Sequence, residues 1–455
     1  IVQDMTGGER MLSLIEELWL LPEPVVKQIA EVRDARTLSA LVLAGFRLGL
    51  ALGAWVVQEE LTERGKRVGA RPSCPKCHRS LESKGLVART VQTLLGRMTW
   101  RRRVWRCPQR CHIGQIAPYD GELGLAPYQQ TSGELQHLAC ELAVFVPFRL
   151  AAYFVARTFG LAIEPKSVWN WVQHAGALSA LRVQQALDAL ADAEALGGDE
   201  GIACTPEETL RQLPLVLGGD GVMVPFRPQA GTPNGKTVWR EVKVGILARL
   251  GTHLTRAGKA VTVLLHRHVV AVLGDMDALR DRLWLVAVYA GIHTSPIVVW
   301  ISDGARGLWR IFAERFDGRA LGVLDFYHAA QHLWRVAKAY FDGRTTMARF
   351  WFQMTRHRLK TGQAAMIIAE LAGLANSTVL PASVQKTLTQ VSAYLAAHRD
   401  NLAYPLYEHL GIPLCSCILE SACKWMIQKR FKGVWMRWSE EGFNHLLHIR
   451  LACVN

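Results

Sequence analysis

Two spacings of apolar residues divide the chain into regions of different secondary structure. Apolar residues recur at helical spacing over Gly8–Arg64, Ser132–Ala195 and Arg344–Tyr407, so each of these stretches predicts helices. Between residues 214 and 326 they instead form short continuous or alternating runs, which are typical of strands. The pattern therefore predicts three helical stretches and one region in which strands and helices are mixed.

The mixed region follows a definite order. Three strands are predicted by PLVLGGDGVMVPF, TVWREVKVGILARL and AVTVLLHRHVVAVL, followed by a helix over Asp275–Gly291 and a fourth strand in PIVVWIS. A helix in GLWRIFAERF, a fifth strand in ALGVLDF and a helix from Tyr327 complete it. This is the element order of an RNase H-like fold. The helical stretch that follows is more than that fold needs, so we expect an insertion.

Four cysteines lie in two close pairs, CPKC and CPQRC: Cys74, Cys77, Cys107 and Cys111. Two such turns can bring four thiolates to one tetrahedral ion, which is the arrangement of a structural zinc site. Residues 90–106 predict two strands around Gly96, as a zinc ribbon has between its metal-binding turns. His78 and His112 stand beside the pairs as substitute ligands, because the second pair has an extra intervening residue. Four ordinary buried cysteines are the alternative.

The chain is basic and rich in apolar residues. It has 455 residues, 50% of them hydrophobic, which is enough for about two to four domains. Its 53 lysines and arginines against 39 acidic residues give a net charge of +14 and favour a polyanionic partner, nucleic acid first and an anionic membrane surface second. The most apolar window, Leu41–Val57, contains Arg47, so we expect a buried helix rather than a membrane span.

The N-terminal residues have no secretory-signal pattern, and Ile1 stands where an initiator Met is expected. We therefore expect a cytoplasmic protein whose natural start lies further upstream. Ten cysteines in such a protein favour thiols and metal sites over a disulfide framework.

Two stretches have the residue types of nucleic-acid contacts. The predicted ribbon interleaves tryptophans with arginines, which suits a DNA backbone, although a solvated charge run is the alternative. These arginines are Arg101, Arg102, Arg103 and Arg106. Pro147–Gly176 predicts a helix, a turn at Gly160 and a second helix, which resembles a helix-turn-helix; an ordinary helical hairpin is the alternative. The second helix would offer Lys166, Asn170 and Gln173 to a groove.

Three carboxylates fall on elements that an RNase H-like sheet brings together. Asp220 lies within the first strand, Asp303 ends the fourth strand beside it, and Glu420 lies on a final helix across that edge. Carboxylates at one point repel each other unless cations neutralise them. We therefore predict two Mg²⁺ or Mn²⁺ ions, about 4 Å apart, for an in-line phosphoryl displacement. Taken singly, each acid has an ordinary explanation, and for Asp220 it is a GGDG hairpin turn.

These motifs carry a resemblance to a known family. The chain resembles the ISKra group of bacterial insertion-sequence transposases, relatives of the Mutator-like DDE enzymes, in GGDGVMVPF, TVWREVKVG, ISDGARGLW, LDFYHAAQHLW, ILESACKWMIQKRFKG and MRWSEEG. The resemblance covers most of the chain and is strongest from Gly218 onward. It implies that Asp220, Asp303 and Glu420 form the metal-binding triad, and that the segment between Asp325 and Glu420 is the helical insertion of the superfamily.

The resemblance also implies roles for residues outside the triad. Asp325 and His328 in DFYH match the acid-x-x-His signature of such enzymes and would hold a flanking nucleotide or position a ligand. In an alternative assignment Asp325 is the second metal ligand. On the last helix Lys424, Gln428 and Lys432 follow at i+4 steps, so one face would hold the DNA backbone beside the metals; a solvated face is the alternative.

One turn departs from the family pattern. Cys415-Ser416-Cys417 stands just before the Glu420 helix, where the family usually has Gly-Ser-Gly. If either glycine supplies a positive φ or a close backbone approach, cysteine strains the turn that places Glu420. We expect small buried thiols here, and a metal site from Cys415, Cys417 and Cys423 is the alternative.

We therefore predict a DDE transposase of α/β class. It would bind the terminal inverted repeats of an insertion sequence, cut DNA with metal-activated water and transfer the freed 3′-hydroxyl to target DNA. We expect a homo-oligomer on double-stranded DNA, associated with the nucleoid and not with a membrane. A catalytically inactive, decayed or repurposed, DNA-binding protein is the alternative, and a nuclease for branched DNA is a third possibility.

The expected domains follow the changes in pattern along the chain. They are an N-terminal helical region (1–66), a zinc-ribbon-like domain (67–126), a helical, helix-turn-helix-like domain (127–198), an RNase H-like catalytic core (212–343), a helical insertion (344–408) and a C-terminal helix that completes the core (409–455).

Overall fold

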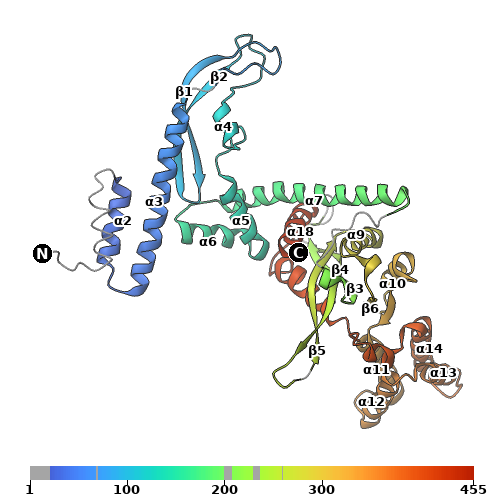
Figure 1. The fold of residues 1–455 in the computed structure, drawn as a ribbon. Helices are drawn as coiled ribbons and strands as arrows, with labels where there is room; N and C mark the ends of the chain where they lie inside the picture. Colours follow the sequence, from blue (N-terminus) through green and yellow to red (C-terminus); the bar gives the residue numbers. More distant parts are fainter. Residues whose placement is uncertain (1–20, 68–69, 199–207, 229–235, 259) are drawn as a thin grey trace. The chain divides into compact units, whose positions relative to one another are not determined.

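The structure is a computed structural model that describes residues 21–67, 70–198, 208–228, 236–258 and 260–455 (Figure 1). The chain divides into two compact units, Ile1–Trp171 and Val172–Asn455. The boundary between the units falls within one long helix, α7 (Pro165–Ala195).

The described part of the first unit begins with two helices, α2 (Glu23–Asp34) and α3 (Leu38–Lys66). The prediction that the apolar window of α3 is buried is wrong, because Val42 and Leu43 are 61% and 56% exposed. Apolar side chains surround this helix, whereas it packs against α2 and the hairpin strand β2 on only part of its circumference. In the described part of the chain, α3 is the helix long and apolar enough to cross a membrane, by length and composition only.

A hairpin and short helices make up the rest of the first unit. β1 (Glu82–Thr93) and β2 (Gly96–Arg106) pair antiparallel, which confirms the two strands predicted around Gly96. Gly96 has a φ of +113°, a conformation that glycine adopts without a side-chain clash. Gly160 ends α6 in the left-handed conformation, so the predicted helix, turn and second helix are present. The helices before α7 are α4 (Pro118–Glu122), α5 (Gly133–Phe145) and α6 (Phe148–Phe159).

The second unit contains a five-stranded mixed sheet with the order β5-β4-β3-β6-β7. The pairs β3–β4 and β4–β5 are antiparallel, whereas β3–β6 and β6–β7 are parallel. The predicted succession of three strands, helix, strand, helix, strand and helix is confirmed. Its elements are α8 (Glu208–Arg211), β3 (Leu215–Phe226), β4 (Val238–Leu254), β5 (Ala260–Val272), α9 (Met276–Tyr289), η2 (Ile292–Thr294), β6 (Val298–Ser302), α10 (Arg306–Ile311), η3 (Phe312–Phe316), β7 (Leu321–Leu324) and α11 (Phe326–Phe341).

The chain after α11 is helical to its end, as predicted. The helices are α12 (Thr346–Lys360), α13 (Ala364–Ala375), α14 (Ala382–Ala397), η4 (Arg399–Asn401), α15 (Tyr404–His409), α16 (Cys417–Ala422), the π-helical turn η5 (Cys423–Gln428), α17 (Lys429–Phe431) and α18 (Glu440–Val454).

Apolar cores cover both faces of the sheet. Leu215 and Leu217 of β3 belong to a core that includes Leu279 of α9. Val216 alternates with them and joins the core of the opposite face, together with Val299 of β6. That second core also contains residues of α11, α13 and α14. The helical stretch after residue 344 therefore shares its core with the sheet.

Candidate functional site

Asp220 lies in the middle of β3, the central strand of the sheet. It pairs with Val244 of β4 within a continuous ladder, so the hairpin-turn explanation of GGDG is wrong. Gly218, two residues before Asp220, is explained by close packing of the neighbouring strand. A Cβ at Gly218 would lie 2.0 Å from the carbonyl oxygen of Ile301 on the neighbouring strand. The glycines thus allow β3 to approach its neighbours closely.

Asp303 directly follows β6, and the strand register brings it beside Asp220. β3 and β6 are parallel with Leu217 opposite Trp300, and the same register continued along both strands pairs the two acids. Burial raises the pKa of Asp220 above the usual carboxyl range, and the charge of Asp303 raises it further. The structure therefore brings together two of the predicted acids.

Packing from the helical stretch fixes the loop that carries Asp303. The backbone oxygen of Asp303 accepts a hydrogen bond from Trp309 Nε1 at 2.7 Å. Tyr394 of α14 lies against Gly304, where a Cβ would come 2.0 Å from the tyrosine ring. The Tyr394 ring stacks on His332 of α11, with centroids 3.8 Å apart. Sequence reasoning missed Tyr394 and His332, because helical spacing does not indicate which distant loop a residue meets.

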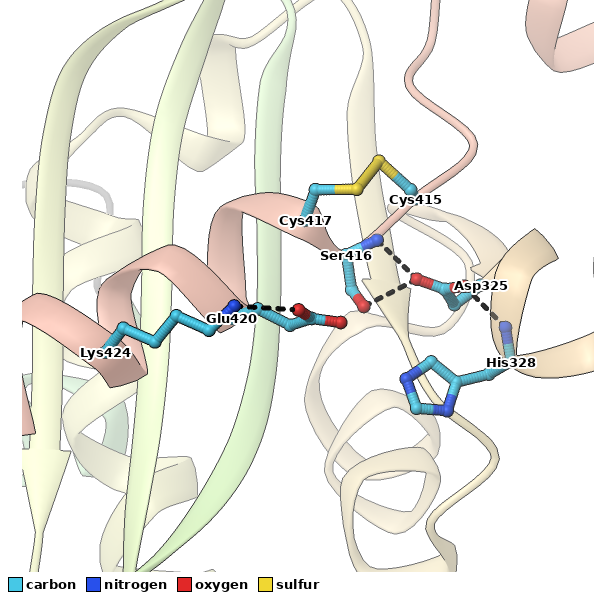
Figure 2. The surroundings of a disulfide bond; sticks show 7 residues. All are labelled: Asp325, His328, Cys415, Ser416, Cys417, Glu420 and Lys424. Carbon is cyan, nitrogen blue, oxygen red and sulfur yellow. Dashed lines mark hydrogen bonds and ion pairs between the residues drawn. A yellow bond between two sulfur atoms is a disulfide. The ribbon is translucent and has the colours of Figure 1, made fainter. Parts of the chain in front are cut away.

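Glu420 lies on α16, which packs against β3. Its exposed carboxylate accepts a hydrogen bond from Lys424 Nζ at 3.4 Å (Figure 2). Cys423, at the start of the next turn, lies with its Sγ 3.6 Å from Asp220 Oδ2. Burial raises the pKa of Cys423, and the charges of Asp220 and Glu420 raise it further. Asp220 and Glu420 therefore lie close enough to act on one buried thiol.

The three carboxylates are less tightly gathered than the four paired cysteines. Among the residues that the structure describes, only those cysteines form a group of three or more ligand atoms within 4.8 Å of one another. Asp220 is the neighbour of Asp303 in the strand register, whereas Glu420 forms an ion pair with Lys424. The donor set fits Mg²⁺ or Mn²⁺, because these hard ions take carboxylate oxygens. Such cations would also remove the repulsion between the acids.

Asp325 connects the start of α11 to the start of α16 (Figure 2). It is 2% exposed, and its Oδ2 accepts hydrogen bonds from the backbone N and the Oγ of Ser416 at 2.5 and 2.6 Å. Its Oδ1 accepts from the backbone N of His328 at 2.8 Å. Because both oxygens bind groups of the chain, the geometry favours a positioning role over metal binding.

His328 lies at the first turn of α11 and is half-buried. Burial is the largest cause of the raised pKa of Asp220, and the electrostatic interaction with His328 lowers that pKa. His328 therefore lies within electrostatic reach of Asp220.

Substituting Asp325 by Ala is expected to lower the free energy of unfolding by about 3 kcal/mol, because the buried donors of Ser416 lose a charged acceptor. Ser416→Ala, which removes only the hydroxyl, is expected to cost about 1 kcal/mol. Urea denaturation measures both values. Asp317→Ala, at an exposed turn, serves as the control. If Asp325→Ala is as stable as that control, the connection does not hold α16 in place.

The two cysteines that flank Ser416 form a disulfide with Cα atoms 5.3 Å apart (Figure 2). This corrects the expectation of two buried thiols, and it removes both sulfurs from the alternative metal site with Cys423. The separation lies within the range of roughly 4.4–6.8 Å that a disulfide needs. Neither Cys415 nor Cys417 is among the described residues with a positive φ, so the first of the two conditions for strain in this turn is not met.

The expected basic face of the helix that carries Glu420 is interrupted. The turn over Cys423–Gln428 is π-helical, and α17 ends at Phe431. Because a π-helical turn closes i to i+5, Lys424 and Gln428 no longer lie in one line across it. Lys424 pairs with Glu420, whereas Lys432 lies beyond α17 with its Nζ 5.4 Å from the ring centroid of Trp239. The prediction of a single face with Gln428 between the two lysines is therefore wrong.

The four paired cysteines, Cys74, Cys77, Cys107 and Cys111, are gathered at one end of the hairpin. Their sulfurs lie within 4.8 Å of one another, and the Cys77 and Cys107 sulfurs are 3.6 Å apart. A tetrahedral zinc ion with Zn–S bonds of about 2.3 Å separates its sulfurs by about 3.8 Å, so the cluster can bind structural zinc. The Lys76 backbone N also donates to Cys74 Sγ at 3.4 Å. His78 and His112 are exposed outside the cluster and are not needed as ligands.

The predicted DNA-contacting arginines differ in their surroundings. Arg102 forms an ion pair with Asp120 at 3.0 Å, and its side chain is 11% exposed. Arg101 and Arg106 are exposed, and Arg103 donates to Ser83 Oγ at 3.1 Å. Arg102 therefore holds the hairpin to α4, whereas the exposed arginines are accessible to a ligand.

The residues predicted at the helix-turn-helix lie along α7. Lys166 is exposed with its Nζ 3.6 Å from the ring centroid of Trp169, and Asn170 is exposed. Gln173 Oε1 is 2.8 Å from His445 Nδ1 on α18. Gln173 thus contacts another helix of its own unit.

Comparisons with known proteins give a distant likeness among solved structures. No protein-family model matches the chain, and no curated protein matches its sequence. The structure of the Drosophila P element transposase strand transfer complex is similar over 74% of this chain and 95% of that chain, with 12% identity and a TM-score of 0.32. An identity and a TM-score this low assign no function to the present chain.

Proposed function

We propose that the chain is a DDE transposase with Asp220, Asp303 and Glu420 as its metal-binding acids. The observation that carries the proposal is the register of β3 and β6, in which Asp220 and Asp303 are neighbours, with the Glu420 helix packed on β3. The order of antiparallel and parallel strands supports an RNase H-like sheet. The motif resemblance to ISKra-group insertion-sequence transposases supports the class of reaction.

The chain's own residues would prepare a phosphodiester for in-line displacement. Asp220 and Asp303 would hold the metal ions, and Glu420 would join them when it leaves Lys424. The chemistry that two bound Mg²⁺ or Mn²⁺ ions supply is activation of the attacking water or hydroxyl and stabilisation of the leaving oxygen. Asp325 would keep the Glu420 helix in position through Ser416, and His328 would hold a flanking nucleotide.

The remaining parts would bind DNA. The zinc-bearing hairpin and the helix pair α6–α7 would contact the terminal inverted repeats through Arg101, Arg106, Lys166 and Asn170, with Lys424 and Lys432 near the metals. The net charge of +14 supports a polyanionic partner. Because two element ends must be held at once, we propose a homo-oligomer on nucleoid DNA. We also propose six domains, with the bounds 1–66, 67–126, 127–198, 212–343, 344–408 and 409–455.

Glu420→Gln tests the proposal. Full-length protein is incubated with labelled duplexes from the DNA that borders the gene, with Mg²⁺ or Mn²⁺, and cleavage and strand transfer are followed on sequencing gels. We expect Glu420→Gln to lower cleavage at least about 100-fold, because a metal ligand is lost, with DNA binding unchanged.

Glu408→Gln is the matched control, because Glu408 and Glu420 are both exposed glutamates with a lysine partner, at 2.8 and 3.4 Å. It is expected to cleave like the wild type. Equal cleavage by wild type and Glu420→Gln would remove Glu420 from the triad.

A catalytically inactive DNA-binding protein is the second candidate. The observation in its favour is that Glu420 pairs with Lys424 and that the three acids do not gather within 4.8 Å among the described residues. Such a protein would retard duplex DNA in a gel, with binding that weakens steeply as salt rises, but would produce no cleavage with either metal.

A further inference from the structure

A cavity of about 450 Å³ lies between α11 and α12, apart from the carboxylate site. Its volume falls within the range of roughly 300–1,000 Å³ that small-ligand sites occupy. None of the residues that line it has a part in the proposed cleavage. The residues that matter for its chemistry are Tyr327, Trp334, Arg349, Phe352, Gln353 and Arg356.

Aromatic rings give the cavity apolar surfaces. Trp334 of α11 and Phe352 of α12 meet edge to face, with ring centroids 5.2 Å apart. Tyr327 is 51% exposed at the same cavity, and the guanidinium carbon of Arg356 lies 5.8 Å from its ring centroid. A planar aromatic ligand can stack on such faces, and stacking of this kind does not depend on the identity of a base.

The cavity is also lined by cationic and amide side chains. Arg349 and Gln353 follow each other at i+4 on α12, and both are exposed. Among the described residues that line the cavity none is acidic. Guanidinium groups bind phosphate oxygens in a bidentate manner, and an amide side chain can donate to and accept from the edge of a base. The cavity therefore combines aromatic faces, a hydrogen-bonding edge and phosphate-binding groups.

The cavity and the candidate active site both involve residues of the first turn of α11. Tyr327 lines the cavity, and the next residue, His328, lies within electrostatic reach of Asp220. Because Tyr327 and His328 are consecutive residues of α11, a DNA strand held at His328 would pass the helix turn that lines the cavity. The faces of a base within the duplex are covered by its stacked neighbours, whereas an unpaired base can rotate out and offer its faces to aromatic side chains.

We infer that the α11–α12 cavity binds one unpaired nucleobase of the DNA substrate together with its phosphate. The base stacks among Tyr327, Trp334 and Phe352, and the phosphate lies at Arg349 and Arg356. The inference rests on the proposed function for its substrate and adds a site that selects the structure of the DNA next to the cleavage point.

The test measures binding of full-length protein without added Mg²⁺ or Mn²⁺, so that no cleavage intervenes. Two duplexes are compared, one fully paired and one with a single unpaired 2-aminopurine nucleotide, whose fluorescence falls when it stacks. For the wild type we expect the unpaired duplex to bind at least about tenfold more tightly, with quenching of the probe. Trp334→Leu and Arg349→Ala should lose this preference and keep their affinity for the paired duplex.

The controls separate the cavity from its surroundings. The Tyr327 side chain is exposed, so we expect Tyr327→Leu to fold. This variant should lose the quenching of 2-aminopurine even if Trp334→Leu fails to fold. Phe350→Leu alters a ring on α12 that is 59% exposed and does not line the cavity, and Arg344→Ala removes an exposed charge from the preceding loop; both should behave like the wild type.

Three results would overturn the inference. Equal affinity of the wild type for the two duplexes would refute the cavity's role and leave the proposed transposase intact, whereas failure to bind either duplex would refute both. If a free deoxynucleoside monophosphate changes the tryptophan fluorescence of the wild type but not of Trp334→Leu, and the unpaired duplex is not preferred, the cavity is a site for free nucleotides and not for DNA.

Discussion

Asp220→Asn is expected to lower metal-dependent DNA cleavage by at least about 1,000-fold, which corresponds to about 4 kcal/mol of lost transition-state stabilisation. Asp220 is the acid nearest the centre of the sheet, and Asp303 lies beside it in the register of β3 and β6. An amide cannot replace the negative charge with which Asp220 would bind a metal ion. Cleavage rates with Mg²⁺ and Mn²⁺ measure the effect, and gel retardation should show unchanged DNA binding.

The same substitution should not destabilise the fold. Burial and the neighbouring Asp303 both disfavour the charged form of Asp220, so the neutral amide relieves repulsion when no divalent ion is present. We therefore expect the urea midpoint of Asp220→Asn to equal or exceed that of the wild type. Added Mg²⁺ should stabilise the wild type and not the variant.

Asp317→Asn, at an exposed turn, is the control for both measurements, and Asp303→Asn is expected to reproduce the loss of cleavage. Wild-type rates for Asp220→Asn would mean that these two neighbouring acids bind no catalytic metal. The transposase proposal would then lose the observation that carries it.

Removal of zinc is expected to unfold the cysteine end of the hairpin and to abolish its contribution to DNA binding. The apolar core at that end is small: Cys74, Leu81 and Cys107 are its buried members. So few apolar groups cannot hold two turns in place, whereas structural zinc supplies about 10 kcal/mol or more to such sites. We expect about one zinc per chain in the purified protein by elemental analysis, and Cys107→Ser should lose it.

Hydrogen exchange would locate the change. Protection should fall around the two cysteine pairs and the adjoining ends of β1 and β2, whereas the sheet of the second unit should keep its protection. Cys453→Ser, which alters an exposed thiol on α18, is the control. A protein that holds no zinc, and in which Cys107→Ser leaves exchange unchanged, would mean that the cysteines are ordinary core residues.

Local patterns predicted the elements because their causes are local. The alternation and turn residues around Gly96, and the switch of spacing after Pro214, indicate hairpin and sheet strands wherever those segments lie. The close cysteine pairs indicate one cluster for the same reason, because each pair is held by its own turn. The neighbouring positions of Asp220 and Asp303 followed from a topology that the order of elements already implied.

The misjudged features depend on what each element packs against. The apolar window of α3 was expected to be buried, but hydrophobicity does not specify how much partner surface is available. Arg102 resembles its arginine neighbours in sequence and differs only because Asp120 lies within reach. The line of Lys424 and Lys432 fails because of a π-helical turn, which helical spacing does not reveal.

The sequence by itself indicated the candidate residues: Asp220, Asp303, Glu420 and the four paired cysteines. Only the tertiary structure decided how these residues are held. Asp325 turned out to be buried and bound to Ser416, next to a Cys415–Cys417 disulfide, and Tyr394 of a distant helix closes against the Asp303 loop. The reason is physical: spacing and residue type act within a few residues, whereas burial and hydrogen-bond partners arise between segments that meet only in the folded chain.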